Sequence, residues 1–150
     1  MAPLRFAWPL CFATLACAGS AEVVGTANDL QPSFVITPST VRTGDSCDAV
    51  VSIANPTQDT IVVSNPCGCL ITLTVFHAGA PVSLRGTLFV CQGLTCPHAI
   101  PPRDSLTRTF RLIAVLDRRT APLPLPGSYL ARANLPDPLL PLYAELTIVP

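Results

Sequence analysis

The sequence predicts a single all-β domain made of two antiparallel sheets that pack face to face. Short apolar runs with a period of two alternate with turn residues at intervals of roughly 8 to 12 residues, the spacing of sandwiches and barrels. The 17 prolines are spread through the chain and leave little room for long helices. Strand and helix patterns do not alternate, which argues against a parallel sheet. A chain of 150 residues is long enough for one sizeable core.

The first part of the domain contains three short expected strands separated by turns. The first covers Phe34 to Ile36. Thr43-Gly44-Asp45 then turns the chain into Asp48 to Ala54, where every second residue is apolar. Asn55-Pro56-Thr57 forms the next turn, because proline presets φ and asparagine tolerates turn geometry. The third expected strand is Thr60 to Val63.

The middle of the chain predicts a hairpin followed by a loop. From Cys69 to Phe76 the alternation is regular, with Cys69, Ile71, Leu73 and Val75 on one face. Ala78-Gly79-Ala80-Pro81 reverses the chain into Val82 to Cys91, where Gly86 marks a candidate bulge. Gln92 to Asp104 contains three prolines and is expected to be a loop.

The last third predicts three strands, which brings the expected total to seven or eight. Leu106 to Val115 places Arg108 and Arg111 on opposite faces by parity, so this strand is expected to bend or to lie along an edge. The proline-rich stretch Ala121 to Pro126 predicts a stiff extended connector. The clearest alternation of the whole chain follows, in Tyr129 to Leu135 and in Leu142 to Ile148.

The N-terminus is typical of a secretory signal peptide. Arg5 precedes an apolar run, Phe6 to Ala18, that is too short to span a bilayer and is followed by small residues. We therefore expect residues 1–18 to be a signal peptide, residues 19–31 a flexible tether and residues 32–150 the domain. Thr14 to Cys17 resembles a bacterial lipobox, which would make Cys17 a lipid-bearing N-terminus; plain cleavage is the alternative. The protein is expected in the periplasm or at the cell surface, with a membrane reached only through that lipid.

Five cysteines remain if the leader is removed: Cys47, Cys67, Cys69, Cys91 and Cys96. In an oxidising compartment two disulfides and one spare thiol are expected. In S-N-P-C-G-C-L, Cys67 and Cys69 lie roughly 6.5 Å apart if the strand is extended, so they are poor partners for each other. The first expectation is a bridge from Cys67 or Cys69 to Cys91, with Cys47 and Cys96 competing for the remaining place.

A metal site is the alternative use of these side chains. Cys67, Cys69, Cys91, Cys96 and His98 are soft ligands suited to zinc or copper(I). Their spacings are C-x-C and C-x4-C, whereas structural zinc sites usually pair two C-x-x-C knuckles. We expect neither metal nor any other cofactor.

Other function classes lack their signatures. The chain has two histidines and no G-x-S-x-G nucleophile motif, so no catalytic residue is expected. The formal net charge is zero and every basic residue is an arginine, without the basic stripe that nucleic-acid binding needs. We therefore expect a protein that is not an enzyme and does not bind nucleic acid.

Three phrases together resemble the bacterial BsuPI-type proteinase-inhibitor domain: Ser52 to Val63, Leu73 to Val82 and Leu125 to Leu135. The resemblance covers about Val50 to Leu135 and implies an immunoglobulin-like β-sandwich. It also implies that Tyr129 opens a late strand, where its buried hydroxyl would bond to backbone. Where the family usually carries aromatic phrases, this chain has N-P-C-G-C-L and R-G-T-L-F-V-C, which puts protease inhibition in doubt.

Three functions follow as expectations. The first is a protein-binding or proteinase-inhibitor-like module, in which the loop Gln92 to Asp104 or the connector Pro122 to Pro126 meets a protease or an envelope protein. The second is an envelope protein that binds zinc or copper through cysteine and histidine. The third is a purely structural accessory domain.

Overall fold

The structure is a computed structural model that describes residues 25–64, 69–87, 97–116 and 126–150. These residues are nearly all β, and their one helix is the three-residue 3-10 turn η1 (Ala27–Asp29). The all-β class is confirmed, although the described residues contain eleven strands and not seven or eight. The strands are β1 (Gln31–Thr37), β2 (Thr40–Arg42), β3 (Ser46–Ala54), β4 (Ile61–Val63), β5 (Thr72–His77), β6 (Ala80–Val82), β7 (Leu84–Arg85), β8 (His98–Ile100), β9 (Ser105–Leu116), β10 (Gly127–Asn134) and β11 (Leu142–Val149).

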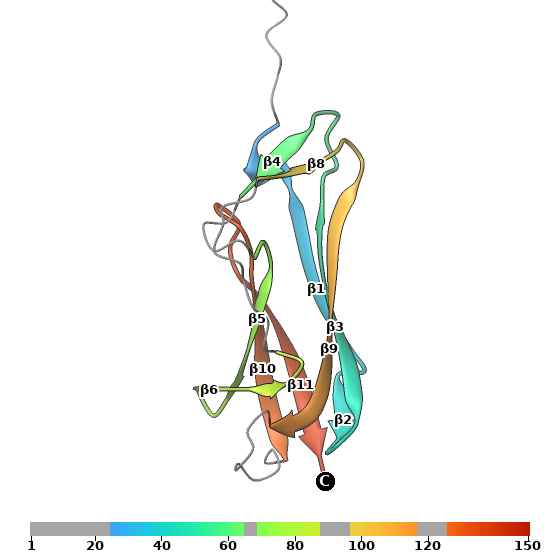
Figure 1. Ribbon diagram of the computed structural model, residues 1–150, viewed down its shortest axis with the longest axis vertical. Coiled ribbons are helices and arrows are strands. Elements are labelled where there is room, and N and C mark those ends of the chain that lie inside the picture. The colour runs from blue at the N-terminus through green and yellow to red at the C-terminus, as the bar shows by residue number, and fades with distance from the viewer. Residues whose placement is uncertain (1–24, 65–68, 88–96, 117–125) are drawn as a thin grey trace, which may run out of the picture.

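The strands form two larger sheets and one small one. The four-stranded sheet has the order β1-β3-β9-β7, and the five-stranded sheet has the order β2-β11-β10-β5-β6. The two larger sheets form two layers, and β4 pairs with β8 at the end of the molecule opposite the C-terminus (Figure 1). The expectation of purely antiparallel sheets is wrong at one edge, because β2 runs parallel to β11.

The core lies between the layers and consists of the side chains that alternation places inward. On β3 every second residue from Cys47 to Ile53 is at most 4% exposed. The same period buries Leu73 and Val75 on β5 and Leu146 and Ile148 on β11. Burial of each large apolar side chain in this way contributes about 1.5 to 3 kcal/mol to the free energy of folding. The predicted inward faces of these strands are therefore confirmed.

The chain begins to pack ahead of Pro32. The Asp29 carboxylate accepts hydrogen bonds from the Thr26 backbone N–H at 2.9 Å and from its hydroxyl at 2.8 Å, and these bonds lower the pKa of Asp29. Leu30 is 5% exposed and belongs to the core. At Pro38 the chain then crosses from one layer to the other, so β1 and β2 are edge strands of different sheets.

The expected strand from Val82 to Cys91 is interrupted in the structure. β6 ends at Val82, β7 covers only Leu84–Arg85, and residues 88–91 lie outside the described residues. Gly86 has φ +97°, and a Cβ at this position would overlap the Arg111 carbonyl oxygen on β9. The register between β7 and β9 shifts between Leu84 and Arg85, so the irregularity lies just before Gly86, the residue at which a bulge was expected.

β9 has described neighbours on both sides only near its C-terminal end. β7 pairs only with the end of β9, through Leu84 with Leu116 and Arg85 with Ile113. Over the rest of its length β9 has β3 on one side and no other described strand on the other. In the order of this sheet β9 lies between β3 and β7, so the expectation that this strand bends or lies along an edge stays a prediction.

No helix in the described ranges is long and apolar enough to cross a membrane.

Candidate functional site on the outer face of the five-stranded sheet

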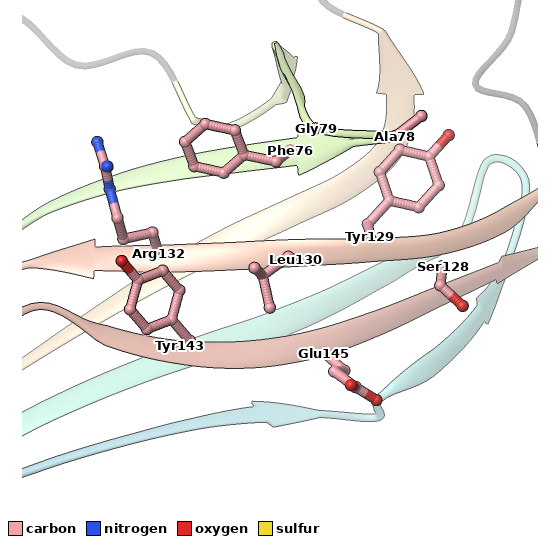
Figure 2. Close-up of a pocket in the computed structure, with 9 residues that line it drawn as sticks. All are labelled: Phe76, Ala78, Gly79, Ser128, Tyr129, Leu130, Arg132, Tyr143 and Glu145. Carbon is pink, nitrogen blue, oxygen red and sulfur yellow. The ribbon is translucent and has the colours of Figure 1, made fainter.

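The outer face of the five-stranded sheet gathers side chains from three strands that are distant in the sequence. In the register of the sheet Leu130 on β10 lies opposite Phe76 on β5 and opposite Glu145 on β11. Arg132, two residues further along β10, lies opposite Tyr143. Tyr129, Ala131 and Ala133 on β10 are buried, so alternation points Leu130 and Arg132 outward. Residues that lie opposite each other in a sheet share a face, so Phe76, Tyr143 and Glu145 also point outward (Figure 2). We call Phe76, Leu130, Arg132, Tyr143 and Glu145 the outer aromatic face.

A hollow of about 490 Å³ lies on this face. The five residues of the outer aromatic face line it together with Ala78, Gly79, Ser128 and Tyr129. The hairpin between β5 and β6 supplies Ala78 and Gly79, so the hollow extends toward that turn. The volume falls within the range of roughly 300 to 1,000 Å³ that holds small molecules or a side chain of a protein partner.

Apolar surface is exposed at the centre of this face. Leu130 is 40% exposed and Tyr143 is 54% exposed. The other large apolar side chains exposed to this degree among the described residues, Val35, Val62 and Leu140, lie outside the outer aromatic face. A contiguous apolar patch that contains aromatic residues and arginine has the composition of a protein interface.

The charged residues of the face lie on opposite sides of Leu130. The Arg132 guanidinium carbon is 5.2 Å from the centre of the Phe76 ring, in a cation–π contact that directs this side chain toward β5. Its Nε is shielded from solvent and has no hydrogen-bond partner among the described residues. Glu145 is exposed on β11, away from Arg132, and Figure 2 shows the two side chains at opposite ends of the group.

Tyr129 and His77 form a stacked aromatic pair beside the face, in which Tyr129 is buried and His77 is half-buried. Tyr129 is 3% exposed, and its ring stacks on His77 with ring centres 4.4 Å apart. The Nδ1 of His77 lies 3.1 Å from the Ser128 carbonyl oxygen across the sheet. Burial raises the pKa of Tyr129. The structural position expected for Tyr129, buried near the start of a late strand, is confirmed.

Polar side chains border the outer aromatic face at the C-terminal end of β10. The Asn134 side-chain amide donates hydrogen bonds of 3.1 Å to the Thr72 hydroxyl and 3.4 Å to the Thr74 hydroxyl. These three side chains occupy the same outer side of β5 and β10 as Phe76 and Leu130. They therefore form a polar boundary beside the apolar centre, as interfaces commonly have.

The predicted cysteine and histidine site is not assembled in the described part of the chain. Cys69 is buried and disulfide-bonded, and its partner lies outside the described residues, as do Cys17, Cys67, Cys91 and Cys96. Cys47 is buried on β3 with a free thiol, so it does not take the place in a bridge for which it was a candidate. His98 is exposed on β8. No group of three or more potential metal ligands occurs among the described residues.

The predicted binding loops are described only in part. Residues 92–96 of the loop Gln92 to Asp104 lie outside the described residues, and β8 occupies His98–Ile100 in what was expected to be irregular chain. Residues 117–125, which contain most of the proline connector, are also outside them.

Sequence reasoning missed the outer aromatic face, although one signal for it was present. Phe76, Leu130 and Tyr143 are apolar residues at outward positions of strands whose inward positions are also apolar. Outward positions of a solvent-covered sheet are normally polar, so these three are exceptions to the pattern. The pattern alone does not show that the three belong to neighbouring strands.

No protein-family profile and no curated protein matches the sequence. Among solved structures, a β-glucosidase from Erythrobacter marinus is 14% identical, with a TM-score of 0.50 over 80% of this chain and 15% of that one. A β-glucosidase from Listeria innocua in complex with isofagomine is 12% identical, with a TM-score of 0.49 over 79% of this chain and 16% of that one. A Pseudomonas fluorescens alkylpurine DNA glycosylase bound to DNA is 10% identical, with a TM-score of 0.46 over 81% and 31%. The chain spans less than a third of each of these proteins, and identities this low concern the fold alone.

Proposed function

We propose that the protein is an exported, non-enzymatic immunoglobulin-like β-sandwich that binds a protein partner through its outer aromatic face. The observation that carries the proposal is the exposed pair Leu130 and Tyr143, which flank an arginine held against Phe76 on a regular sheet. Export rests on the leader, residues 1–18, and the partner class is a protease or an envelope protein.

The strand orders support the immunoglobulin-like assignment. Immunoglobulin domains have one sheet with the order A-B-E-D and another that contains G-F-C. The order β1-β3-β9-β7 corresponds to the first of these, and the run β11-β10-β5 corresponds to the second, with β6 in the place of C′. Tyr129 near the start of β10 is at the position where such domains carry a buried tyrosine on strand F.

The rigidity of the face supports a binding role. β10 is paired on both sides, with β5 and β11, so Leu130 and Arg132 project from a strand that is fully hydrogen-bonded within the sheet. Little conformational entropy is lost when a partner covers side chains on such a scaffold. Tyrosine, phenylalanine and arginine are also the residue types that contribute most to protein interfaces.

One finding disfavours the metal-binding alternative. Cys69 is disulfide-bonded. A sulfur in a disulfide is not a thiolate, and the thiolate is the form of cysteine that binds zinc or copper(I). The proposed metal set therefore loses at least one of its four sulfur ligands.

Site-specific photo-crosslinking in the cells that produce the protein tests the proposal. A photo-reactive amino acid replaces Leu130 in one variant and Val35 in a matched control. Val35 is 56% exposed but lies on β1 of the other sheet. We expect a discrete crosslinked product from position 130 and none from position 35. Absence of a product at both positions, or equal products from both, would overturn the proposal.

A further inference from the structure

We propose that the partner at the outer aromatic face is a second copy of the same chain, bound through a two-fold symmetric contact. In this contact Arg132 of each copy pairs with Glu145 of the other, and Leu130 lies near the symmetry axis. The inference rests on the proposed function, because it names the occupant of the same face.

The charges of the face are complementary to themselves. Arg132 points toward β5 and Glu145 projects from β11, with Leu130 between them (Figure 2). Consider a two-fold axis that lies in the plane of contact, midway between the two charges and perpendicular to the line that joins them. Such an axis exchanges their positions, so it places each cation over an anion. One symmetric contact therefore forms two Arg132–Glu145 ion pairs.

Both charged groups are available for this pairing. Within the described residues, neither Arg132 nor Glu145 has a hydrogen-bond or ion-pair partner, and the Arg132 Nε is shielded from water. Phe76 limits the directions that the guanidinium can take, so less side-chain entropy is lost when the pair forms. An ion pair at an interface is stronger than one in open solvent, because the contact excludes water.

The apolar centre and the net charge favour the same occupant. Leu130 and Tyr143 of one copy would cover Leu130 and Tyr143 of the other and remove exposed apolar surface from both. The full sequence has a formal net charge of zero, and removal of the leader takes away only the charge of Arg5, so two copies repel each other little at long range. A different protein would need its own matching arrangement of charges, whereas a second copy already carries it.

Charge reversal tests the contact by analytical ultracentrifugation of the protein with its disulfide intact. We expect the wild-type chain to dimerise and R132E or E145R alone to raise the dimer dissociation constant at least about tenfold, since each places like charges together. An equimolar mixture of the R132E and E145R chains should form a heterodimer close to wild-type affinity. In that mixture both pairs are again of opposite sign. The R132E/E145R double variant should also recover.

Two further variants, L130E and V35E, separate loss of the contact from loss of the fold. L130E should abolish the dimer while its circular dichroism, and its melting curve at a protein concentration low enough for the wild type to be monomeric, stay unchanged. V35E on the other sheet should leave the dimer intact. If R132E does not fold, E145R and L130E carry the test, because both replace exposed side chains. A wild-type chain that stays monomeric at high concentration, or single variants that dimerise like wild type, would overturn the inference. In that case a crosslink from position 130 to a different protein would still support the proposed function, and no crosslink would remove both.

Discussion

The Asn55 side-chain amide donates a hydrogen bond of 2.9 Å to the carbonyl oxygen of Ile100, and both residues are only 1% exposed. The same amide group also lies 2.8 Å from the Asp59 carbonyl oxygen and 3.1 Å from that of Pro101. Its Oδ1 accepts hydrogen bonds from the Thr57 backbone N–H and hydroxyl. One buried side chain therefore forms the predicted turn after β3 and attaches that turn to β8.

We expect Asn55→Ala to lower the free energy of unfolding by about 2 to 4 kcal/mol, because it leaves buried backbone groups without partners. The matched control is Asn134→Ala, whose amide binds two threonine hydroxyls on the outer face and should cost at most about 1 kcal/mol. Urea unfolding followed by circular dichroism measures both. Equal losses for the two variants would show that the Asn55 cluster has no special role.

Gly86→Ala should destabilise the protein far more than Gly44→Ala. Both glycines have positive φ, +97° and +94°, so the backbone strain of an alanine, about 1 to 2 kcal/mol, is similar. A Cβ at Gly86 meets the Arg111 carbonyl oxygen, whereas nothing lies within 4 Å of a Cβ at Gly44. We expect Gly86→Ala to cost at least about 2 kcal/mol more than Gly44→Ala in thermal or urea unfolding. Similar melting temperatures for the two variants would contradict the close approach of β7 to β9.

Stability should fall as the solution becomes alkaline, in part through Cys47. Burial, with a smaller effect of Asp48, raises the pKa of the Cys47 thiol above its ordinary value of 9.0. Above that pH the unfolded chain loses the thiol proton while the folded chain keeps it, so the free energy of unfolding decreases with rising pH. The stabilisation is complete below pH 9.0 and is lost as the pH rises through the folded value.

Cys47→Ala checks this linkage. Urea unfolding at neutral pH and at several values above 9.0 should show a steeper loss for wild type than for the variant. The loss that remains in the variant should begin near 10.0, the ordinary pKa of tyrosine, because burial also raises the pKa of Tyr129. Identical pH profiles would mean that the Cys47 thiol ionises in the folded state as easily as in the unfolded one.

Replacing the two tyrosines with alanine should affect different properties, namely stability at Tyr129 and self-association at Tyr143. Tyr129→Ala removes a ring that is 3% exposed and stacked on His77, and it should cost about 3 to 5 kcal/mol of folding free energy. Tyr143→Ala removes a ring that is 54% exposed, so it should change monomer stability by less than about 0.5 kcal/mol but weaken self-association. Melting curves at low protein concentration and sedimentation at high concentration separate these effects. A stable Tyr129→Ala variant would contradict the packing beneath the face.

Part of the fold could be predicted because long strands carry their own signal. β10 and β11 have eight residues each, and in both the inward face was identified from alternation alone. β2, β6, β7 and β8 have two or three residues, too few to show a period. Their pairing depends on which strand lies beside them in space, so β8 fell within the expected loop Gln92 to Asp104 and β2 was not predicted as a strand.

The candidate site depends even more on contacts between strands that are distant in the sequence. Cys67 and Cys69 are separated by a single residue in the sequence, yet four of the five candidate cysteines lie outside the described residues or in a disulfide, and Cys47 is a buried free thiol. Phe76, Leu130 and Tyr143 are separated by long stretches of chain and become neighbours only through the register of β5, β10 and β11. Register between distant strands is a property of the folded sheet and has no local sequence signal.

Hydroxyl-radical footprinting of the protein purified from its producing cells tests the central claim, that the outer aromatic face is covered by a protein partner. The reactivity of Tyr143 in the wild-type protein is compared with its reactivity in the L130E variant. The reactivity of Leu130 in the wild type is compared with that of two internal references, Val62 and Leu140, which are 56% and 79% exposed. We expect Tyr143 and Leu130 to be protected in the wild-type protein while the two references react equally in both samples. Tyr143 that reacts as fast in wild type as in L130E would contradict the claim.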